Sequence, residues 1–226
     1  GCRSIAFTYT EPTIGFEYAY DIARLARNVG VANVFVTNGY MTGEMLEVIH
    51  PYLDAANVDL KAFRDRTYQQ YIGARLQPVL DSLKTIKRLG IWLEVTTLVI
   101  PGINDDPAEL RDVAQFIVKE LGADTPWHVS RFFPNYQLTK LPLTPPETLH
   151  RAREIGLAEG LKYVYIGNLA ADDSQNTACP SCGAVLIGRS PCRLLFNRIR
   201  NGCCPDCDYA IAGVEMQGDS LPTYTV

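Results

Sequence analysis

IWLEVTTLVIPGINDDPAELRDVAQFIVKELG, residues 91–122, is the stretch that decides the fold. Its first part is apolar and β-branched, which predicts a strand over 91–100 that ends before Pro101. A helix is expected next, with Asp106 as its N-cap, Pro107 at its first position and Glu109 in its first turn. Apolar residues then recur at helical spacing until the glycine at 122, namely Leu110, Val113, Ala114, Ile117 and Leu121. The stretch therefore predicts one strand–loop–helix unit.

The same unit recurs along the chain. Further strands are expected at 4–9, 33–37, 55–60, 127–133 and 163–166, with a short helix at 44–50. Two helical stripes consist of Ile14, Tyr18, Ile22, Leu25, Ala26 and Val29, and of Leu76, Val79, Leu80, Leu83, Ile86 and Leu89. The last helix is expected to begin at a capping box of Thr144 and Glu147. Alternating strands and helices predict a parallel sheet, and strands with little alternation predict that both its faces are covered.

The chain length limits how the sheet can close. An eight-stranded barrel typically needs about 250 residues, whereas six units fill residues 1–170 of this 226-residue chain. We therefore expect an α/β protein built as a partial (β/α)₆ TIM-like barrel. The polar stretch 170–177 is interpreted as a linker to a cysteine-rich, zinc-ribbon-like module at 177–213, and residues 214–226 as a mobile tail.

Composition excludes several classes of protein. Hydrophobic residues make up 47% of the chain and charged residues 20%, which excludes an intrinsically disordered chain. No run of 18 apolar residues or secretory signal pattern is present in the sequence, so we expect no membrane association. Two CxxC pairs near the C-terminus indicate a metal site in a reducing compartment, which predicts a cytoplasmic location. A net charge of −4 argues against nucleic acid as a partner.

Cysteines cluster near the C-terminus, in Cys179-Pro-Ser-Cys182-Gly and Cys204-Pro-Asp-Cys207-Asp. Two such turns supply four thiolates, which suits a tetrahedral Zn²⁺ site, and iron on the same sulfurs is the chemical alternative. Gly183 and Asp208 follow the turns and tolerate positive φ angles. The remaining cysteines of this region, Cys192 and Cys203, are interpreted as ordinary buried thiols.

Polar side chains gather where the predicted strands end. In a parallel βα fold these ends meet at one mouth, where the active site lies. We expect Glu11, Asp59, Lys61, His128 and Arg131 to meet there, whereas Thr10 and Thr37 could equally cap helices. Asp59 and Lys61 lie two residues apart on a strand and so share a face, as an ion pair or as ligands of a charged group. Lys61 could also be the amine of a Schiff-base, aldolase-like enzyme, and a third alternative is a non-catalytic module that binds a partner.

Five motifs together resemble one known family. They are Ile5–Thr13 (IAFTYTEPT), Val36–Gly39 (VTNG), Asn57–Lys61 (NVDLK), Glu94–Asp105 (EVTTLVIPGIND) and Trp127–Pro134 (WHVSRFFP). Nearly the whole chain is similar to the radical S-adenosylmethionine (SAM) enzymes of the AmmeMemoRadiSam system, which are relatives of pyruvate formate-lyase activating enzyme. The resemblance implies a partial barrel in which a [4Fe-4S] cluster cleaves SAM reductively. The resulting 5′-deoxyadenosyl radical abstracts hydrogen from a substrate, and by analogy that substrate would be a glycyl radical protein.

The resemblance also implies which residues bind SAM, although it singles out no catalytic residue. Thr10 and Glu11 match the family's GGEP-like element, Thr37 and Asn38 its TNG motif, and Asp59 and Lys61 its DLK motif. By position, Thr96 and Tyr136 correspond to contacts with the SAM carboxylate and ribose, and Tyr136 replaces a histidine. The SAM-binding residues implied are therefore Thr10, Glu11, Thr37, Asn38, Asp59, Lys61, Thr96, His128, Arg131 and Tyr136.

One departure concerns the cluster. The family holds its cluster with a CxxxCxxC loop ahead of the GGEP-like element, but this sequence contains no CxxxCxxC and has only Cys2 in that region. We therefore expect a chain that is shortened at its N-terminus and does not perform radical chemistry by itself.

Overall fold

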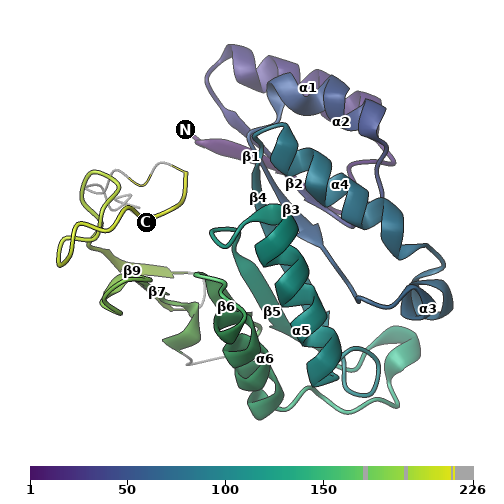
Figure 1. Ribbon diagram of the computed structural model, residues 1–226. Helices are drawn as coiled ribbons and strands as arrows, with labels where there is room; N and C mark the ends of the chain where they lie inside the picture. The colour runs from purple at the N-terminus through teal and green to yellow at the C-terminus, as the bar shows by residue number, and fades with distance from the viewer. Residues whose placement is uncertain (170–172, 191–192, 215, 217–226) are drawn as a thin grey trace.

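The computed structural model describes residues 1–169, 173–190, 193–214 and 216. Its main sheet is parallel and keeps the strands in chain order (Figure 1). The strands are β1 (Ser4–Phe7), β2 (Ala32–Thr37), β3 (Ala55–Asp59), β4 (Trp92–Val99), β5 (Trp127–Arg131) and β6 (Val164–Gly167). The expected α/β architecture with six parallel strands is confirmed.

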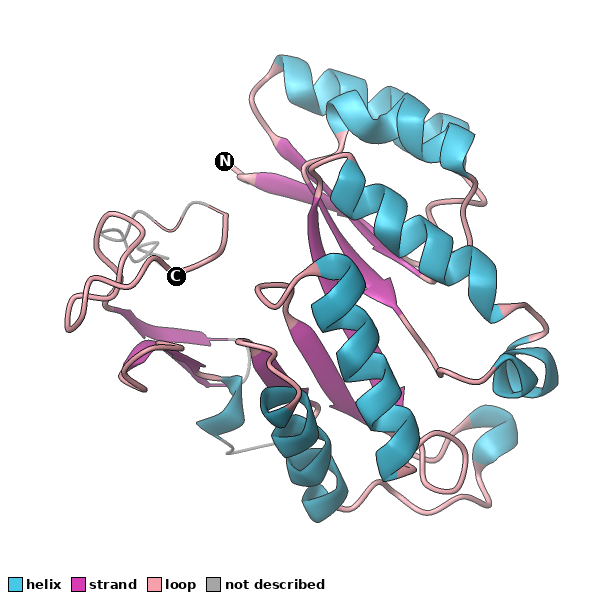
Figure 2. Ribbon diagram, viewed as in Figure 1, coloured by secondary structure: helices cyan, strands magenta, loops and turns pink. Residues whose placement is uncertain are grey.

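Helices cover one face of this sheet (Figure 2). They are α1 (Phe16–Asn28), α2 (Gly43–Ile49), α3 (Asp65–Thr67), α4 (Leu76–Arg88), α5 (Pro107–Phe116) and α6 (Pro146–Ala158). Short helical turns add η1 (His50–Tyr52), η2 (Tyr68–Ile72), η3 (Ile117–Leu121), η4 (Tyr136–Leu138) and η5 (Asp173–Gln175). None of the helices in the described ranges is long and apolar enough to cross a membrane.

The two faces of the sheet differ in burial. Side chains that point toward the helices are buried, among them Phe35, Val58, Val95 and Val129. Alternate residues on the opposite face, which we call the inner face, are only partly buried along β3 and β4. The expectation that both faces are covered is therefore wrong. Six strands do not close a barrel, so the inner face keeps room for polar groups.

Two details of the helices differ from the local sequence pattern. Asp106 caps α5 as expected, but Glu109 accepts a hydrogen bond from the backbone N–H of Phe63 at 2.6 Å. The capping box at Thr144 does not form, because Pro145 is the N-cap of α6. The buried Thr144 hydroxyl instead accepts from the Phe132 N–H at 3.0 Å and donates to the Val99 carbonyl at 2.7 Å. The Thr144 hydroxyl thus satisfies the buried backbone groups of Phe132 and Val99 instead of capping the helix.

Helix α1 packs through its small side chains, and Ala26 is the one member of the expected apolar stripe that is fully buried. Ala19, Ala23 and Ala26 are buried against the sheet. Large apolar members of the predicted stripe are exposed instead: Ile14 by 80%, Tyr18 by 74%, Leu25 by 67% and Val29 by 75%. Small side chains let the helix approach the strands closely, so the alanine face gives the tighter packing.

A second, antiparallel sheet lies beside β6 (Figure 1) and consists of β7 (Thr177–Ala178), β8 (Val185–Ser190) and β9 (Arg193–Asn197). Its core includes Leu186, Ile187, Ile199 and Ile211, and also Tyr163 from the barrel. The Tyr163 hydroxyl accepts a hydrogen bond from the Ala212 N–H at 3.2 Å, and the Tyr165 hydroxyl forms one with Thr177 Oγ1 at 2.9 Å.

Residue 170, Cys192 and most of the predicted tail 214–226 lie outside the described ranges, so the predicted boundaries stay predictions.

Candidate functional site

Toward the N-terminal ends of β4 and β5, the inner face carries a charged and aromatic cluster. The sequence analysis named only His128 of this cluster, and expected it at the mouth. Glu94 of β4 accepts hydrogen bonds from the Trp92 indole at 3.1 Å and from His128 Nε2 at 2.7 Å. The His128 ring stacks on Tyr165, with centroids 5.3 Å apart. Trp92, Glu94 and Thr96 at alternate positions of β4 are the signal that could have located this cluster.

The electrostatics of the cluster favour an ionised Glu94. Burial raises the pKa of its carboxyl, but the hydrogen bond and charge of His128, the Trp92 hydrogen bond and the charge of Arg189 together lower it below its usual value of 4.5. Arg189 belongs to the C-terminal module, and its guanidinium lies 5.7 Å from the centre of the Tyr165 ring. The barrel and the C-terminal module therefore build this cluster jointly.

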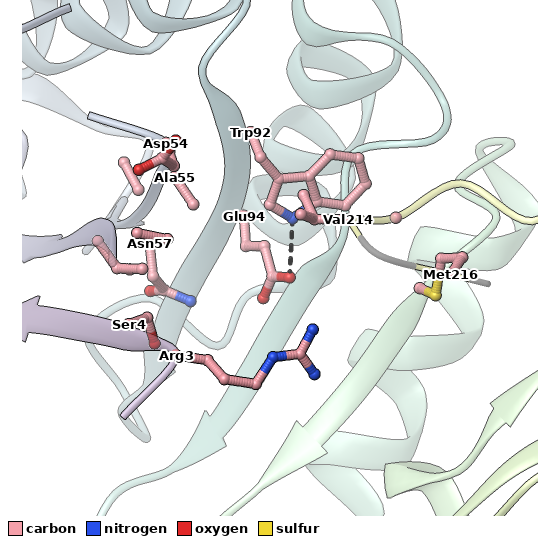
Figure 3. Close-up of a pocket in the computed structure, with 13 residues that line it drawn as sticks. Arg3, Ser4, Asp54, Ala55, Asn57, Trp92, Glu94, Val214 and Met216 are labelled. Carbon is pink, nitrogen blue, oxygen red and sulfur yellow. Dashed lines mark hydrogen bonds between the residues drawn. The ribbon is translucent and has the colours of Figure 1, made fainter. Parts of the chain in front are cut away.

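Two cavities border the cluster. One of about 520 Å³ lies at the N-terminal ends of β1–β4, and Glu94 and Arg3 point into it (Figure 3). The second, of about 430 Å³, lies between the barrel and the C-terminal module and is lined by His128, Tyr165 and Arg189. Trp92, Glu94 and Met216 line both cavities. Volumes of this size suit a small-molecule ligand or part of a larger one.

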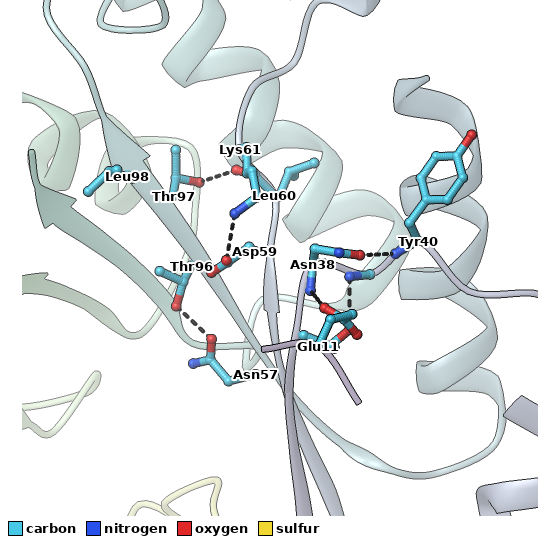
Figure 4. A network of polar contacts seen from close by, with 12 residues as sticks. Glu11, Asn38, Tyr40, Asn57, Asp59, Leu60, Lys61, Thr96, Thr97 and Leu98 are labelled. Carbon is cyan, nitrogen blue, oxygen red and sulfur yellow. Dashed lines mark hydrogen bonds and ion pairs between the residues drawn. The ribbon is translucent and has the colours of Figure 1, made fainter. Parts of the chain in front are cut away.

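The mouth at the C-terminal strand ends is drawn in Figure 4. It lies on the same face as this cluster, since Thr96 follows Glu94 by two residues along β4. Lys61 Nζ and Asp59 Oδ2 form an ion pair at 2.7 Å, with side chains 39% and 37% exposed. The Thr96 hydroxyl donates to Asn57 Oδ1 at 2.7 Å on the neighbouring strand. The structure thus brings together Asp59, Lys61 and Thr96 of the predicted SAM-binding set, at a point that a ligand can reach.

Glu11 is held by the loops that follow β1 and β2. Its carboxylate accepts from the Thr13 N–H at 3.2 Å, the Thr13 hydroxyl at 2.7 Å, the Thr37 hydroxyl at 2.6 Å and the Asn38 N–H at 2.8 Å. Gly39 has φ of 75°, and a Cβ there would lie 2.6 Å from Val58 Cγ1, so only glycine fits. Glu11 therefore positions the Thr37-Asn38-Gly39 turn beside the mouth.

The other predicted residues lie elsewhere. Thr37 is buried on the helix side of the sheet and bonds to Glu11. Arg131 shares the face of Trp127 and Val129, and its Nε donates to the Thr144 carbonyl at 2.8 Å, so the expectation that it joins the mouth is wrong. Alternation along β5 sends His128 and Arg131 to opposite faces. Thr10 lies exposed in the loop after β1, and Tyr136 is 84% exposed at the start of η4.

The four cysteines of the predicted metal site converge. Their sulfurs all lie within 4.8 Å of one another, with Cys179 and Cys207 at 3.6 Å and Cys182 and Cys204 at 3.7 Å. Four thiolates around one tetrahedral ion at about 2.3 Å would lie about 3.8 Å apart, which these separations match. Gly183 and Asp208 have φ of 77° and 57°, as the turns were expected to require.

The thiols that the structure describes do not fit a [4Fe-4S] cluster at the mouth. Cys2 is exposed and precedes β1, so it lies toward the N-terminal end of the sheet, opposite the mouth. Cys179, Cys182, Cys204 and Cys207 are engaged with one another in the C-terminal module. Cys203 is half-buried rather than buried as expected.

Curated proteins are similar to this chain in sequence. The uncharacterized protein MJ0808 of Methanocaldococcus jannaschii is 48% identical over 188 residues, which are 83% of this chain and 56% of that protein. Pyruvate formate-lyase-activating enzyme of Clostridium pasteurianum is 24% identical over 113 residues, 50% of this chain and 47% of that enzyme. The chain thus spans about half the length of these curated relatives.

A solved structure supports the fold independently. A domain of pyruvate-formate lyase-activating enzyme from Bacteroides vulgatus superposes with a TM-score of 0.63 at 18% identity, over 74% of this chain and 100% of that one. A family model described as the radical SAM superfamily matches residues 1–117, more than half of the sequence. The chain therefore belongs to the radical SAM superfamily.

Proposed function

We propose that this chain binds SAM at the strand-end mouth and contributes that half of a radical SAM enzyme. The Asp59–Lys61 ion pair carries the proposal, because it presents both signs of charge on an open inner face. The methionine end of SAM carries an ammonium and a carboxylate, which are the complementary charges. Asn57 and Thr96 on the adjoining strands add uncharged hydrogen-bonding groups at the same level.

SAM cleaved reductively supplies a 5′-deoxyadenosyl radical, which is the chemistry of the superfamily. The cysteines within the described ranges do not hold the required cluster at the mouth, so we assign no step of that cleavage to them. What its own residues do is bind and orient: Asp59 and Lys61 take the charged end of SAM, and Glu11 fixes the Asn38 turn.

The cavity of about 430 Å³ is proposed to bind the part of the substrate that reacts. His128 and Glu94, whose side chains lie on the same inner face as the mouth, offer a hydrogen-bonding pair in its wall. Among the relatives, activating enzymes predominate, and one structural neighbour is described as bound to a precursor peptide. These names support a protein substrate, of which a glycyl radical protein is the proposed example.

The C-terminal module is proposed to hold one Zn²⁺ in a structural role. Four thiolates complete a tetrahedral shell and leave no coordination position open for substrate. The sulfur separations suit one ion, whereas a four-iron cluster would place its thiolates farther apart because each binds a different iron. The ion fixes the two CPxC turns of the module whose strand β8 carries Arg189, a residue that lines the second cavity.

Equilibrium dialysis with radiolabelled SAM tests the binding site on the 226-residue chain. Lys61→Met and Asp59→Asn should each weaken binding by roughly tenfold or more, since each leaves a charge unpaired. Lys119→Met, at an exposed position far along the helical side, is the matched control and should leave affinity unchanged. Equal SAM affinity in all four proteins would refute a site at the Asp59–Lys61 pair.

A further inference from the structure

Arg189 lies partly buried in the wall of the second cavity, between the barrel and the C-terminal module. No ion pair joins its guanidinium to a carboxylate of any residue that the structure describes. Glu94, the one acidic residue among the described lining residues, bonds to Trp92 and His128 instead. A partly buried positive charge without a negative partner indicates a place for an anionic group.

The side chain of Arg189 is held in one orientation by its neighbours. Its Nη1 donates to the Gln175 carbonyl at 3.0 Å and to Thr177 Oγ1 at 2.7 Å. The guanidinium also lies over the Tyr165 ring, whose hydroxyl forms a hydrogen bond with the same Thr177 oxygen at 2.9 Å. Because these contacts exist without a ligand, little conformational entropy remains to be lost on binding.

The backbone at Arg189 departs from a regular ladder. Gly188 pairs with Phe196 and Arg189 with Leu194, so the register of β8 and β9 shifts between these two pairs. A bulge of this kind re-aims a neighbouring side chain. A Cβ at position 188 would overlap the Phe196 ring, so glycine is required beside the shift. The Arg189 N–H donates to Asn176 Oδ1 at 2.7 Å, which anchors the strand at this point.

One edge of the guanidinium remains for a ligand. Both side-chain hydrogen bonds start from Nη1, and no acceptor among the described residues takes a hydrogen bond from Nε or Nη2. The N–H groups of Nε and Nη2 run parallel and match the two oxygens of a carboxylate. Trp92, His128 and Tyr165 add aromatic surface to the same cavity. The site therefore suits a carboxylate that is attached to an apolar group.

The charge of Glu94 discriminates between anions. Its carboxylate lies in the wall of the same cavity and accepts hydrogen bonds from Trp92 and His128. Repulsion from this charge is twice as large for a dianion as for a monoanion at the same distance. A carboxylate is therefore favoured over a doubly charged phosphate.

We infer that Arg189 binds a carboxylate of the substrate in this cavity and thereby determines specificity. The inference rests on the function proposed above for calling the bound molecule the substrate, whereas the carboxylate site itself requires neither SAM nor the mouth. An acidic side chain of a protein supplies such a group, and so does a free organic acid. The C-terminal module thus contributes selectivity to the barrel.

Quenching of Trp92 fluorescence tests the site on the 226-residue chain. Trp92 lines the cavity, whereas Trp127, the other tryptophan, is fully buried. The probes are phenylbutyrate with its neutral amide, and a capped Gly-Glu-Gly peptide with its Gly-Gln-Gly counterpart. The acid should bind at least about tenfold more tightly than its neutral partner in one pair or both. Preference in the peptide pair assigns an acidic side chain, and preference in the first pair alone assigns a free acid. Equal affinities within both pairs overturn the inference.

Three variants locate the carboxylate. Arg189→Gln should abolish the preference, and Glu94→Gln should strengthen binding of the acid several-fold because the opposing charge is removed. Arg198→Gln is the matched control, since this exposed arginine of the same module pairs with Asp206 at 2.9 Å, and it should leave the preference unchanged. Circular dichroism and bound metal show whether each variant is folded. If Arg189→Gln does not fold, the Glu94 variant decides, and unchanged or weaker binding of the acid by it overturns the inference.

Two further comparisons exclude other occupants. Phenylpropylphosphonate at mildly alkaline pH should bind more weakly than phenylbutyrate, and tighter binding overturns the choice of a carboxylate. Glu215→Gln combined with Asp219→Asn removes two acidic groups near the C-terminus of the sequence and should leave affinity for the acid unchanged. A marked gain in affinity would assign the site to a carboxylate of this chain and overturn the inference.

SAM binding, measured by equilibrium dialysis, separates this inference from the proposed function. Loss of the carboxylate preference while SAM still binds at the Asp59–Lys61 pair overturns the inference alone. Absence of SAM binding while the carboxylate preference persists overturns only the proposed function.

Discussion

Replacing Glu11 with glutamine distinguishes a positioning role from direct ligand binding. In the structure its carboxylate accepts four hydrogen bonds, three at one oxygen and one at the other. A glutamine keeps one acceptor oxygen and adds an NH₂ donor. One orientation turns that NH₂ toward the Asn38 N–H and sets two donors against each other. The reverse orientation sets the NH₂ against the Thr13 N–H, while the hydroxyls of Thr13 and Thr37 can rotate and accept from it.

Either orientation loses one charge-assisted hydrogen bond from a backbone N–H, for which about 2 kcal/mol is a reasonable central value. For a chain of this size, 1 kcal/mol lowers the melting temperature by about 2–4 °C. Glu11→Gln should therefore lower the melting temperature by about 4–8 °C. The loss should be present without SAM, because the four partners belong to the protein itself.

Differential scanning calorimetry with and without SAM measures this effect. Glu154→Gln changes an exposed carboxylate of α6 in the same way and should stay within about 0.5 kcal/mol of the parent. A Glu11→Gln protein with unchanged melting temperature but much weaker SAM binding would show that the carboxylate serves the ligand. That result would refute the positioning role argued from its four hydrogen bonds.

Three further outcomes are expected. Cys207→Ser should abolish stoichiometric zinc, whereas Cys203→Ser should retain it, and metal analysis that finds neither zinc nor iron in the parent protein would contradict the site. The pKa of Glu94 is lowered in the fold, so its ionised carboxylate stabilises the folded state above the usual pKa of 4.5, and this stabilisation is lost as pH falls below that value. Glu94→Gln should therefore lower the free energy of unfolding most near neutral pH. Urea unfolding should show the difference between the two proteins shrinking toward about pH 4. After anaerobic treatment with iron, sulfide and dithionite, this chain should release no 5′-deoxyadenosine from SAM, and fusing a CxxxCxxC segment ahead of Ser4 should restore it; chromatographic detection of turnover by the chain alone would overturn the expectation.

Features that depend on neighbouring residues in the sequence were predicted well. Repeated strand–loop–helix units predicted the six parallel strands, and the two CPxC turns predicted the four convergent sulfurs. Asp59 and Lys61 were expected on one face because strand side chains alternate, and they form an ion pair there. In each case the relevant geometry is set within a few residues, by backbone sterics or by chain alternation.

Features that depend on which partner a group meets were decided by the tertiary structure. The pattern of α1 contains two candidate faces, and close packing selects the alanines over the larger stripe. Thr144 leaves its capping box because distant strand ends offer buried backbone partners. Glu94 and His128 lie 34 residues apart in sequence and meet only because β4 and β5 are neighbours. Local patterns specify what a residue can do, while burial and competition between distant partners decide what it does.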